Sequence, residues 1–232
     1  MIPIRDDNPV GKTPYMTIFI IAANVLVFLY QIMLGGRGGE EFIFKFGAIP
    51  FEITHFTEVG TNPVYDTPFP NIFTLFTAMF IHGGFMHIIG NMLYLWIFGD
   101  NIEYIMGSFR FLLFYLLVGL AASFSHIIME PSSAVPMIGA SGAISGVLGA
   151  YLIKFPKAKV LVVIFLFIII QTVYIPAVFV LGFWFLMQLV SGFSSLGVKG
   201  GGGVAWWAHI GGFITGILLV NKFQKRRVTL YW

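Results

Sequence analysis

The sequence predicts an all-α membrane protein: a polytopic bundle of six transmembrane helices, forming a single domain over residues 1–232. Composition is the first observation behind this prediction, because 58% of the residues are hydrophobic and only 10% are charged. An ordinary soluble domain has about 45–50% apolar and about 25% charged residues. A soluble fold could not bury this much apolar surface with so few charges left to face water. We therefore expect the lipid bilayer to surround most of the chain.

The second observation is a series of apolar stretches along the chain. Six membrane helices of about 20 residues each use roughly half of the sequence, which leaves no room for a second folded domain. The predicted spans are residues 15–34, 73–99, 109–129, 141–154, 177–193 and 206–220. The second of them is expected to contain a short helix, a break at Gly83 and Gly84, and then the membrane helix. Residues 35–71 carry five of the ten acidic residues and are interpreted as one long extramembrane loop.

The third observation is the distribution of Lys and Arg, which predicts the orientation. With six spans, ten of these side chains fall on one side of the membrane and three on the other. The larger group is Arg5, Lys12, Arg110, Lys154, Lys157, Lys159, Lys222, Lys225, Arg226 and Arg227; the smaller is Arg37, Lys45 and Lys199. Cytoplasmic loops carry the excess of positive charge. Residues 1–14 and 221–232 are therefore predicted to be cytoplasmic tails, with the cell (inner) membrane as the location.

One further apolar stretch, Val160 to Gln171, is not counted as a span. It has only 12 residues, and a spanning helix needs at least about 17. Its Val, Ile and Phe content suits a strand or a segment that lies at the interface. If it crossed the membrane, the final basic cluster would fall outside. We expect it at the inner membrane surface, with a hairpin as one possible form.

Polar side chains in three of the spans are predicted to reach a similar depth. Ser141 begins the fourth span, His209 lies in the first turn of the sixth, and His87 and Asn91 lie in the outer part of the second. All three spans run from the outside inward. Polar and ionisable residues inside a membrane are costly and by default indicate a functional site.

Helix spacing relates these residues to one another. Ser141 and Ser145 share a face of the fourth span, four residues apart. Gly212 and Gly216 follow His209 on the sixth span and form a pair of small residues that lets two backbones approach closely. Packing of these two faces would bring His209 against Ser141 or Ser145. A serine hydroxyl needs such a neighbouring base to become a nucleophile, and histidine accepts and returns a proton near neutral pH.

His87 and Asn91 also share one helix face, and both can donate hydrogen bonds to a developing negative oxygen. No carboxylate lies within a span at this depth. Glu130, at the outer end of the third span, is the only acid that could serve as a third catalytic member. A Ser-His dyad is therefore favoured over a triad.

These residues resemble the motifs of the rhomboid intramembrane serine proteases. Gly139 to Gly142 reads GASG, which is similar to the family's GxSG, and residues 208–212 read AHIGG, which is similar to AHxxG. His87 and Asn91 resemble the HxxxN of the second helix. The resemblance covers residues 74–220 in the family order. Each motif is short, but three of them in order at one predicted depth are specific.

The resemblance implies a six-helix rhomboid-like bundle with Ser141 as nucleophile and His209 as base. It implies an oxyanion site made by Asn91, His87 and the Ser141 backbone amide, with Gly139, Gly142, Gly212 and Gly216 in the motif backbone and packing. The substrates implied are single-span membrane proteins within the lipid bilayer, with no cofactor, metal ion or nucleic acid. Ser145 stands where many members have a tyrosine that stacks on the histidine.

Other classes can be weighed on the sequence alone. The absence of cysteine excludes a thiol nucleophile or a thiolate metal site. A zinc protease needs HExxH, an aspartyl protease needs two aspartates within spans, and a GxSxG elbow needs glycine at residue 143, which is alanine. A transporter should show corresponding broken helices in two halves. The remaining alternative is a non-catalytic rhomboid-like protein that binds membrane helices, which would be expected to have lost Ser141 or His209.

Overall fold

The computed structural model describes residues 2–8, 10–59, 66–166, 169–196 and 203–225. Lys199, Arg226 and Arg227, which contribute to the charge count, lie outside the described residues. The longer helices are α1 (Tyr15–Met33), α2 (Gly35–Phe46), α5 (Phe85–Met106), α6 (Ser108–Met129), α7 (Ser141–Lys154), α8 (Ala177–Ser195) and α9 (Trp206–Phe223). The shorter ones are α3 (Pro50–His55), α4 (Thr74–Thr77) and two 3₁₀ turns that flank α4, Asn71–Phe73 and Ala78–Phe80; the strands are β1 (Ile2–Asp6), β2 (Lys159–Leu166) and β3 (Ile169–Pro176).

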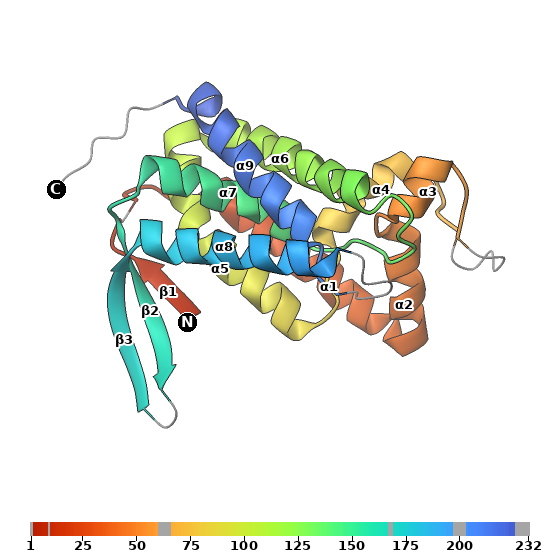
Figure 1. The fold of residues 1–232 in the computed structure, drawn as a ribbon, viewed down its shortest axis with the longest axis horizontal. Helices are drawn as coiled ribbons and strands as arrows, with labels where there is room; N and C mark the ends of the chain where they lie inside the picture. Colours follow the sequence, from red (N-terminus) through yellow and green to blue (C-terminus); the bar gives the residue numbers. More distant parts are fainter. Residues whose placement is uncertain (1, 9, 60–65, 167–168, 197–202, 226–232) are drawn as a thin grey trace.

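The helices form a bundle, and the chain is predominantly helical, as predicted (Figure 1). Three described helices are long and apolar enough to cross a membrane alone: α1, α6 and α8. The pair Asn71–Phe80 and Phe85–Met106, bent by 80°, counts as a fourth if it is taken as one span. The chain is therefore a multi-pass membrane protein. Helix α7 has 14 residues, which at 1.5 Å per residue extend about 21 Å, less than the ~30 Å apolar thickness of a bilayer.

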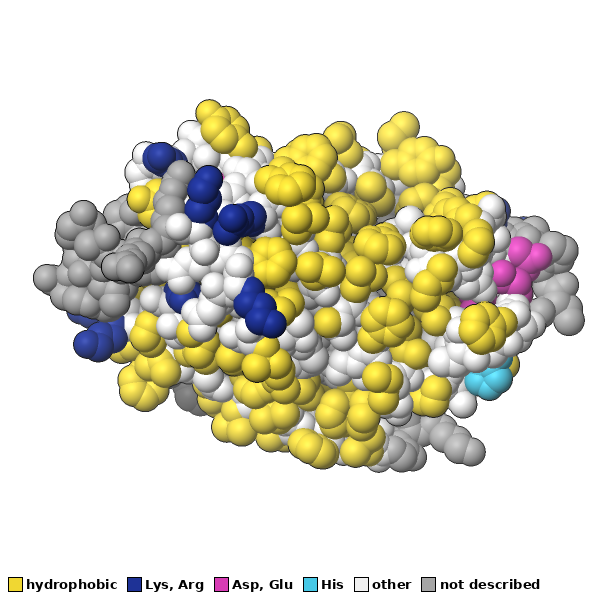
Figure 2. Space-filling model, turned by 90° about the horizontal axis from the view of Figure 1, so that it is seen from above, with side chains coloured by type: hydrophobic (Ala, Val, Ile, Leu, Met, Phe, Trp, Pro, Cys, Tyr) yellow, Lys and Arg dark blue, Asp and Glu magenta, His cyan; other side chains and the backbone are white. Residues whose placement is uncertain are grey.

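Helix α7 can be short because it lies inside the bundle. Its residues from Ala143 to Tyr151 are all buried, and it packs against α5, α6 and α9. On the face shown in Figure 2, apolar side chains cover the middle of the molecule, between one end where Lys and Arg side chains gather and an opposite end that carries acids. This distribution of side chains matches a body surrounded by lipid with two polar ends.

Glycines allow the backbones of α7 and α9 to touch. A side-chain carbon built at Gly212 would overlap the carbonyl oxygen of Gly142, and one built at Gly216 would overlap that of Gly146. Gly149 approaches the carbonyl oxygen of Phe213 in the same way. Because lipid tails are as apolar as a leucine side chain, close backbone packing of this kind is what holds membrane helices together. The contact also sets how deep the first turn of α9 lies beside the start of α7.

A buried carboxylate stabilises the bundle where α1 begins and α5 ends. Glu103 near the end of α5 accepts hydrogen bonds from the backbone N–H groups of Met16 (3.0 Å) and Thr17 (2.8 Å). It also accepts from the hydroxyls of Thr17 (2.9 Å) and Ser108 (2.5 Å). The first N–H groups of a helix have no partner within that helix. Glu103 therefore caps α1 and ties it to the α5–α6 turn.

The all-α prediction is wrong at the end of the bundle where α9 terminates, because β1, β2 and β3 form an antiparallel sheet in that order. The stretch Val160 to Gln171 takes the hairpin form, with Val160 opposite Ile175, and it extends beyond the helices (Figure 1). Residues 1–14 are not a simple tail, since Ile2 pairs with Val163. The hydroxyl of Tyr151 on α7 donates to Asp6, and burial raises the pKa of the Asp6 carboxyl to about 6.

The interpretation of residues 35–71 as a loop is also wrong, because α2 and α3 lie within this segment at the end opposite the sheet (Figure 1). The glycines of α2 suggested a loop because glycine lowers intrinsic helix propensity. Tertiary packing overrides that preference. The ring of Phe42 lies 5.7 Å from that of Tyr30 on α1, and the ring of Phe46 lies 5.9 Å from that of Phe69.

Candidate active site

Ser141 is the first residue of α7 and follows a turn that only glycine adopts easily. Gly139 has φ +113°, a region that side chains disfavour, and its N–H donates to the carbonyl of Ala78 at 2.8 Å. A side-chain carbon at Gly139 would also lie 2.7 Å from Nε2 of His87. The turn thus positions Ser141 at a helix N-terminus, where its backbone N–H has no partner within the helix.

His209 lies in the first turn of α9 and contacts this serine. Its Nε2 is 2.8 Å from Oγ of Ser141, across 68 residues of sequence. Ser145, the other serine on the same face, is fully buried and donates its hydroxyl to the carbonyl of Ser141 at 2.6 Å. The helix packing therefore brings His209 to Ser141, whereas the hydroxyl of Ser145 bonds to its own helix.

The other ring nitrogen of His209 has a partner that the sequence analysis missed. Nδ1 of His209 lies 2.8 Å from Oε1 of Gln188 on α8. Glu130, the acid considered for this position, directly follows Met129 as the C-terminal cap of α6. A glutamine inside an otherwise apolar span is the signal that could have indicated this contact, because polar residues there are costly.

Asn91 and His87 lie beside the turn before Ser141. The side-chain nitrogen of Asn91 lies 3.5 Å from the position of a side-chain carbon at Gly139. Asn91 is buried, and this nitrogen has no hydrogen-bond partner among the described residues. Nδ1 of His87 accepts from the N–H of Gly83 at 3.3 Å. In a neutral ring, one nitrogen accepts and the other donates, so Nε2 of His87 carries a hydrogen on the side of Gly139.

A cavity of about 630 Å³ opens beside Ser141 and His209. Its lining is Gly83, Gly84, Phe85, Met86, His87, Ile138, Ser141, Gly203, Val204, Ala205 and His209. The walls come from the start of α5, the start of α7 and the segment that enters α9. Neither Asn91 nor α8 is part of this lining. The cavity has room for water and for a segment of peptide chain at the serine hydroxyl.

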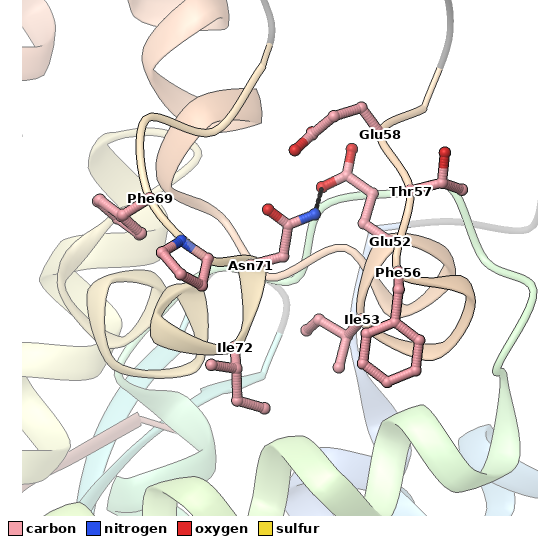
Figure 3. A pocket seen from close by; sticks show the side chains of 9 residues that line it. Glu52, Ile53, Phe56, Thr57, Glu58, Phe69, Asn71 and Ile72 are labelled. Carbon is pink, nitrogen blue, oxygen red and sulfur yellow. Dashed lines mark hydrogen bonds between the residues drawn. The ribbon is translucent and has the colours of Figure 1, made fainter.

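A second cavity, of about 590 Å³, lies around α3 (Figure 3). Glu52 accepts there from the N–H of Val59 at 2.9 Å and from the side-chain nitrogen of Asn71 at 3.4 Å. Burial raises the pKa of the Glu52 carboxyl to about 7, and the nearby carboxylate of Glu58 adds to this effect. The described residues that line this cavity include no serine or histidine. The nucleophile–base pair therefore belongs to the first cavity.

The residues of this site lie within a region that matches a known protein family. The model of the rhomboid domain matches residues 70–226, which include Ser141, His209, His87 and Asn91. The chain belongs to the rhomboid family. This range begins just before the 3₁₀ turn Asn71–Phe73 and extends through α9, so it covers every helix that contributes a side chain to the first cavity or to the Ser141–His209 contact.

Similar individual proteins carry names from the same family. The chain is 34% identical over 142 residues to the rhomboid protease GluP of Bacillus subtilis, covering 61% of this chain and 25% of that protein. It is 29% identical over 164 residues to the mitochondrial rhomboid protein 1 of Saccharomyces cerevisiae, covering 65% and 44%. It is 32% identical over 150 residues to the mitochondrial presenilin-associated rhomboid-like protein of Homo sapiens, covering 63% and 34%. The matched region thus spans less than half of the length of these relatives.

Proposed function

We propose that this rhomboid-family chain is an intramembrane serine endopeptidase that cleaves membrane-spanning segments of other proteins. The observation that carries the proposal is the 2.8 Å contact between Oγ of Ser141 and Nε2 of His209 at the edge of a cavity of about 630 Å³. The proposal includes a single domain of six membrane helices, in which α7 and α9 complete the set formed by α1, α5, α6 and α8.

The mechanism begins at the serine. Nε2 of His209 takes the hydroxyl proton while Oγ of Ser141 attacks the scissile carbonyl carbon, which forms a tetrahedral intermediate with a negative oxygen. The side-chain nitrogen of Asn91, Nε2 of His87 and the backbone N–H of Ser141 are the donors available to this oxygen. Collapse of the intermediate breaks the C–N bond, and His209 returns the proton to the leaving amine. Water then hydrolyses the acyl-enzyme by the same steps.

The alternative is a non-catalytic rhomboid-like protein that binds membrane helices. Such a protein has no need for a hydrogen-bonded serine and histidine, and Ser141 and His209 are both present and in contact. The side-chain nitrogen of Asn91 is a buried donor with no partner in the described part of the chain, which is costly unless a ligand or transition state uses it. These two observations favour the protease.

Reaction with a fluorophosphonate probe tests the proposal, because such probes react only with activated serines. The purified protein should be labelled at Ser141, and peptide mapping of the adduct should identify this residue. The Ser141→Ala variant should remain unlabelled. A folded wild-type protein without any labelling would support the helix-binding alternative instead.

The proposed substrates are single-span membrane proteins. A helical peptide bond hides its carbonyl in the hydrogen-bond ladder of the helix, so the substrate must unwind before Ser141 can attack. Glycine and other poor helix formers near the cleaved bond ease this unwinding. Among the three helices that are each long and apolar enough to cross a membrane, α8 is the least buried, with 22% of its 18-residue apolar segment buried. We infer that a substrate enters from lipid beside α8.

The proposed orientation places both termini in the cytoplasm of a cell whose inner membrane holds the protein. Cysteine labelling can test this cleanly because the chain has no cysteine. Arg37 on α2 has a side chain that is 81% exposed, and Lys157 between α7 and β2 is exposed. A membrane-impermeant thiol reagent applied outside intact cells should label the Arg37→Cys variant, and the Lys157→Cys variant should react only in inverted vesicles. Labelling of the Lys157→Cys variant from outside would contradict this topology.

A further inference from the structure

We propose that Gln188 on α8 is the positioning residue of this site, which fixes the proton and the ring orientation of His209 for reaction with Ser141. This inference rests on the proposed function. It adds a third side chain to the Ser-His pair, from a helix that contributes nothing to the lining of the cavity beside Ser141.

The first step is the orientation of the Gln188 amide. Its Nε2 donates to the carbonyl of Trp184 at 3.1 Å, one turn earlier in the same helix. A backbone carbonyl can only accept a hydrogen bond, so the nitrogen of the amide must face Trp184. The amide oxygen then faces the other way and lies 2.8 Å from Nδ1 of His209. The network thereby excludes the flipped amide.

The second step is the proton on His209. Because Oε1 of Gln188 has no hydrogen to give, Nδ1 of His209 must be the donor and must carry the hydrogen. In the neutral ring, Nε2 then holds a lone pair that points at Oγ of Ser141, 2.8 Å away. This is the protonation state that a general base needs. The wrong ring tautomer at a serine–histidine site costs on the order of 10⁴-fold in turnover in a triad protease.

The third step is the setting of the contact. Gln188 is 6% exposed, and hydrogen bonds are stronger where water is excluded. The ring of Trp184 lies 5.9 Å from that of His209, and the ring of Trp206 lies edge-on at 6.1 Å. In this chain, Ser145 cannot stack on the histidine as a tyrosine would. Gln188 and the two tryptophans therefore hold the ring from the side of α8 and of the first turn of α9.

Gln188 is neutral, which distinguishes it from the negatively charged carboxylate of a catalytic triad. A carboxylate would hold Nδ1–H in the same place and would also stabilise the protonated ring. A neutral amide orients the ring without that second effect. Replacement of the amide by a carboxylate should therefore keep the geometry and change the pH dependence of the reaction, which a merely structural residue would not do.

The test compares Gln188→Met, Gln188→Glu and a matched control, Asn24→Leu. Asn24 on α1 is also buried and donates to its own helix one turn earlier, at the carbonyl of Ile20 (2.8 Å). Its oxygen has no partner among the described residues. Asn24→Leu thus removes a buried amide of the same kind without removing a contact to His209, and should leave the rate and its pH profile unchanged.

We expect Gln188→Met to lower kcat and the rate of fluorophosphonate labelling by about 10²-fold, with KM changed by less than about twofold, because the ring loses its fixed tautomer. Gln188→Glu should recover most of the rate at high pH and move the acidic limb of the pH–rate profile upward by about one unit, because a nearby negative charge favours the protonated ring. A wild-type rate and profile in Gln188→Met, with the melting temperature unchanged, would overturn the inference. A rise in KM at constant kcat would overturn it too, since it would indicate a substrate contact.

A second measurement is independent of catalysis. Nitrogen-15 NMR of the five histidines, with the His209 signals assigned by their loss in a His209→Ala variant, reports which ring nitrogen carries the hydrogen. We expect hydrogen on Nδ1 in the wild type and a mixture of tautomers in Gln188→Met. Hydrogen on Nε2 in the wild type would refute the role of Gln188. Hydrogen on Nδ1 in a protein that no probe labels would leave the positioning intact and contradict the proposed protease.

Discussion

Replacement of Ser141 by alanine should lower cleavage of a model membrane substrate by at least about 10³-fold. The reason is that no other described hydroxyl contacts His209, and loss of a catalytic serine costs on the order of 10⁶-fold in turnover in subtilisin. Ser141 makes its side-chain contact with His209 at the edge of a cavity, so alanine should fit there without strain. Turnover of a fluorogenic transmembrane peptide in detergent or liposomes, with melting temperature as the check on folding, measures this effect.

Ser145→Ala is the matched control, four residues further along the same helix. The hydroxyl of Ser145 donates to the carbonyl of Ser141, so its loss removes one buried hydrogen bond, worth about 1 kcal/mol of stability. Activity should stay within a few-fold of the wild type. An inactive Ser145→Ala together with an active Ser141→Ala would reverse the assignment of the nucleophile.

Asn91→Ala should lower kcat by about 10²–10³-fold and change KM little, because an oxyanion donor acts mainly in the transition state. The same variant should unfold at the wild-type temperature or slightly above it. The side-chain nitrogen of Asn91 is buried without a partner among the described residues, and an unsatisfied buried donor costs stability. Loss of activity without loss of stability distinguishes this residue from a structural one.

The control for Asn91 lies on the same helix, nearer its C-terminal end. Asn101 is also buried, but its side chain donates to Asp6 at 3.1 Å and accepts from Asn8 at 2.7 Å. Asn101→Ala should therefore lower the melting temperature and leave kcat unchanged. Single-turnover kinetics on both variants, together with thermal unfolding, give the comparison. Unchanged turnover in Asn91→Ala would remove this residue from the mechanism.

The order and type of the long helices could be predicted from local patterns. Runs of apolar residues select helices in a membrane because every backbone group must be paired within the segment. The break at Gly83 and Gly84 could also be predicted, because a glycine pair interrupts a helix. A hairpin after Val160 was one of the expected forms, because short runs rich in Val and Ile favour strands. The small residues at Gly212 and Gly216 indicated which helix faces meet.

The elements that were missed depend on partners far away in the sequence. Strand β1 is a polar, proline-containing segment that becomes a strand because Ile2 pairs with Val163. Helix α2 is rich in glycine and becomes a helix where Phe42 packs against Tyr30. Neither segment has a local pattern strong enough to predict a strand or a helix against its polar or glycine-rich composition. Pairing with β2 and packing against α1 supply the free energy that stabilises these two elements. This contribution depends on both of the segments in contact, so neither segment predicts it alone.

The sequence by itself determined the membrane class, the family motifs and the residue types available for chemistry, since these depend on composition and on spacing along one chain. Only the tertiary structure decided that His209 meets Ser141 rather than Ser145, and that Gln188 rather than Glu130 holds the other ring nitrogen. Both contacts depend on the positions of α7, α8 and α9 relative to one another, along and around their axes. The glycine contacts between α7 and α9 set that geometry, because a shift of one residue along a helix turns each side chain by about 100°.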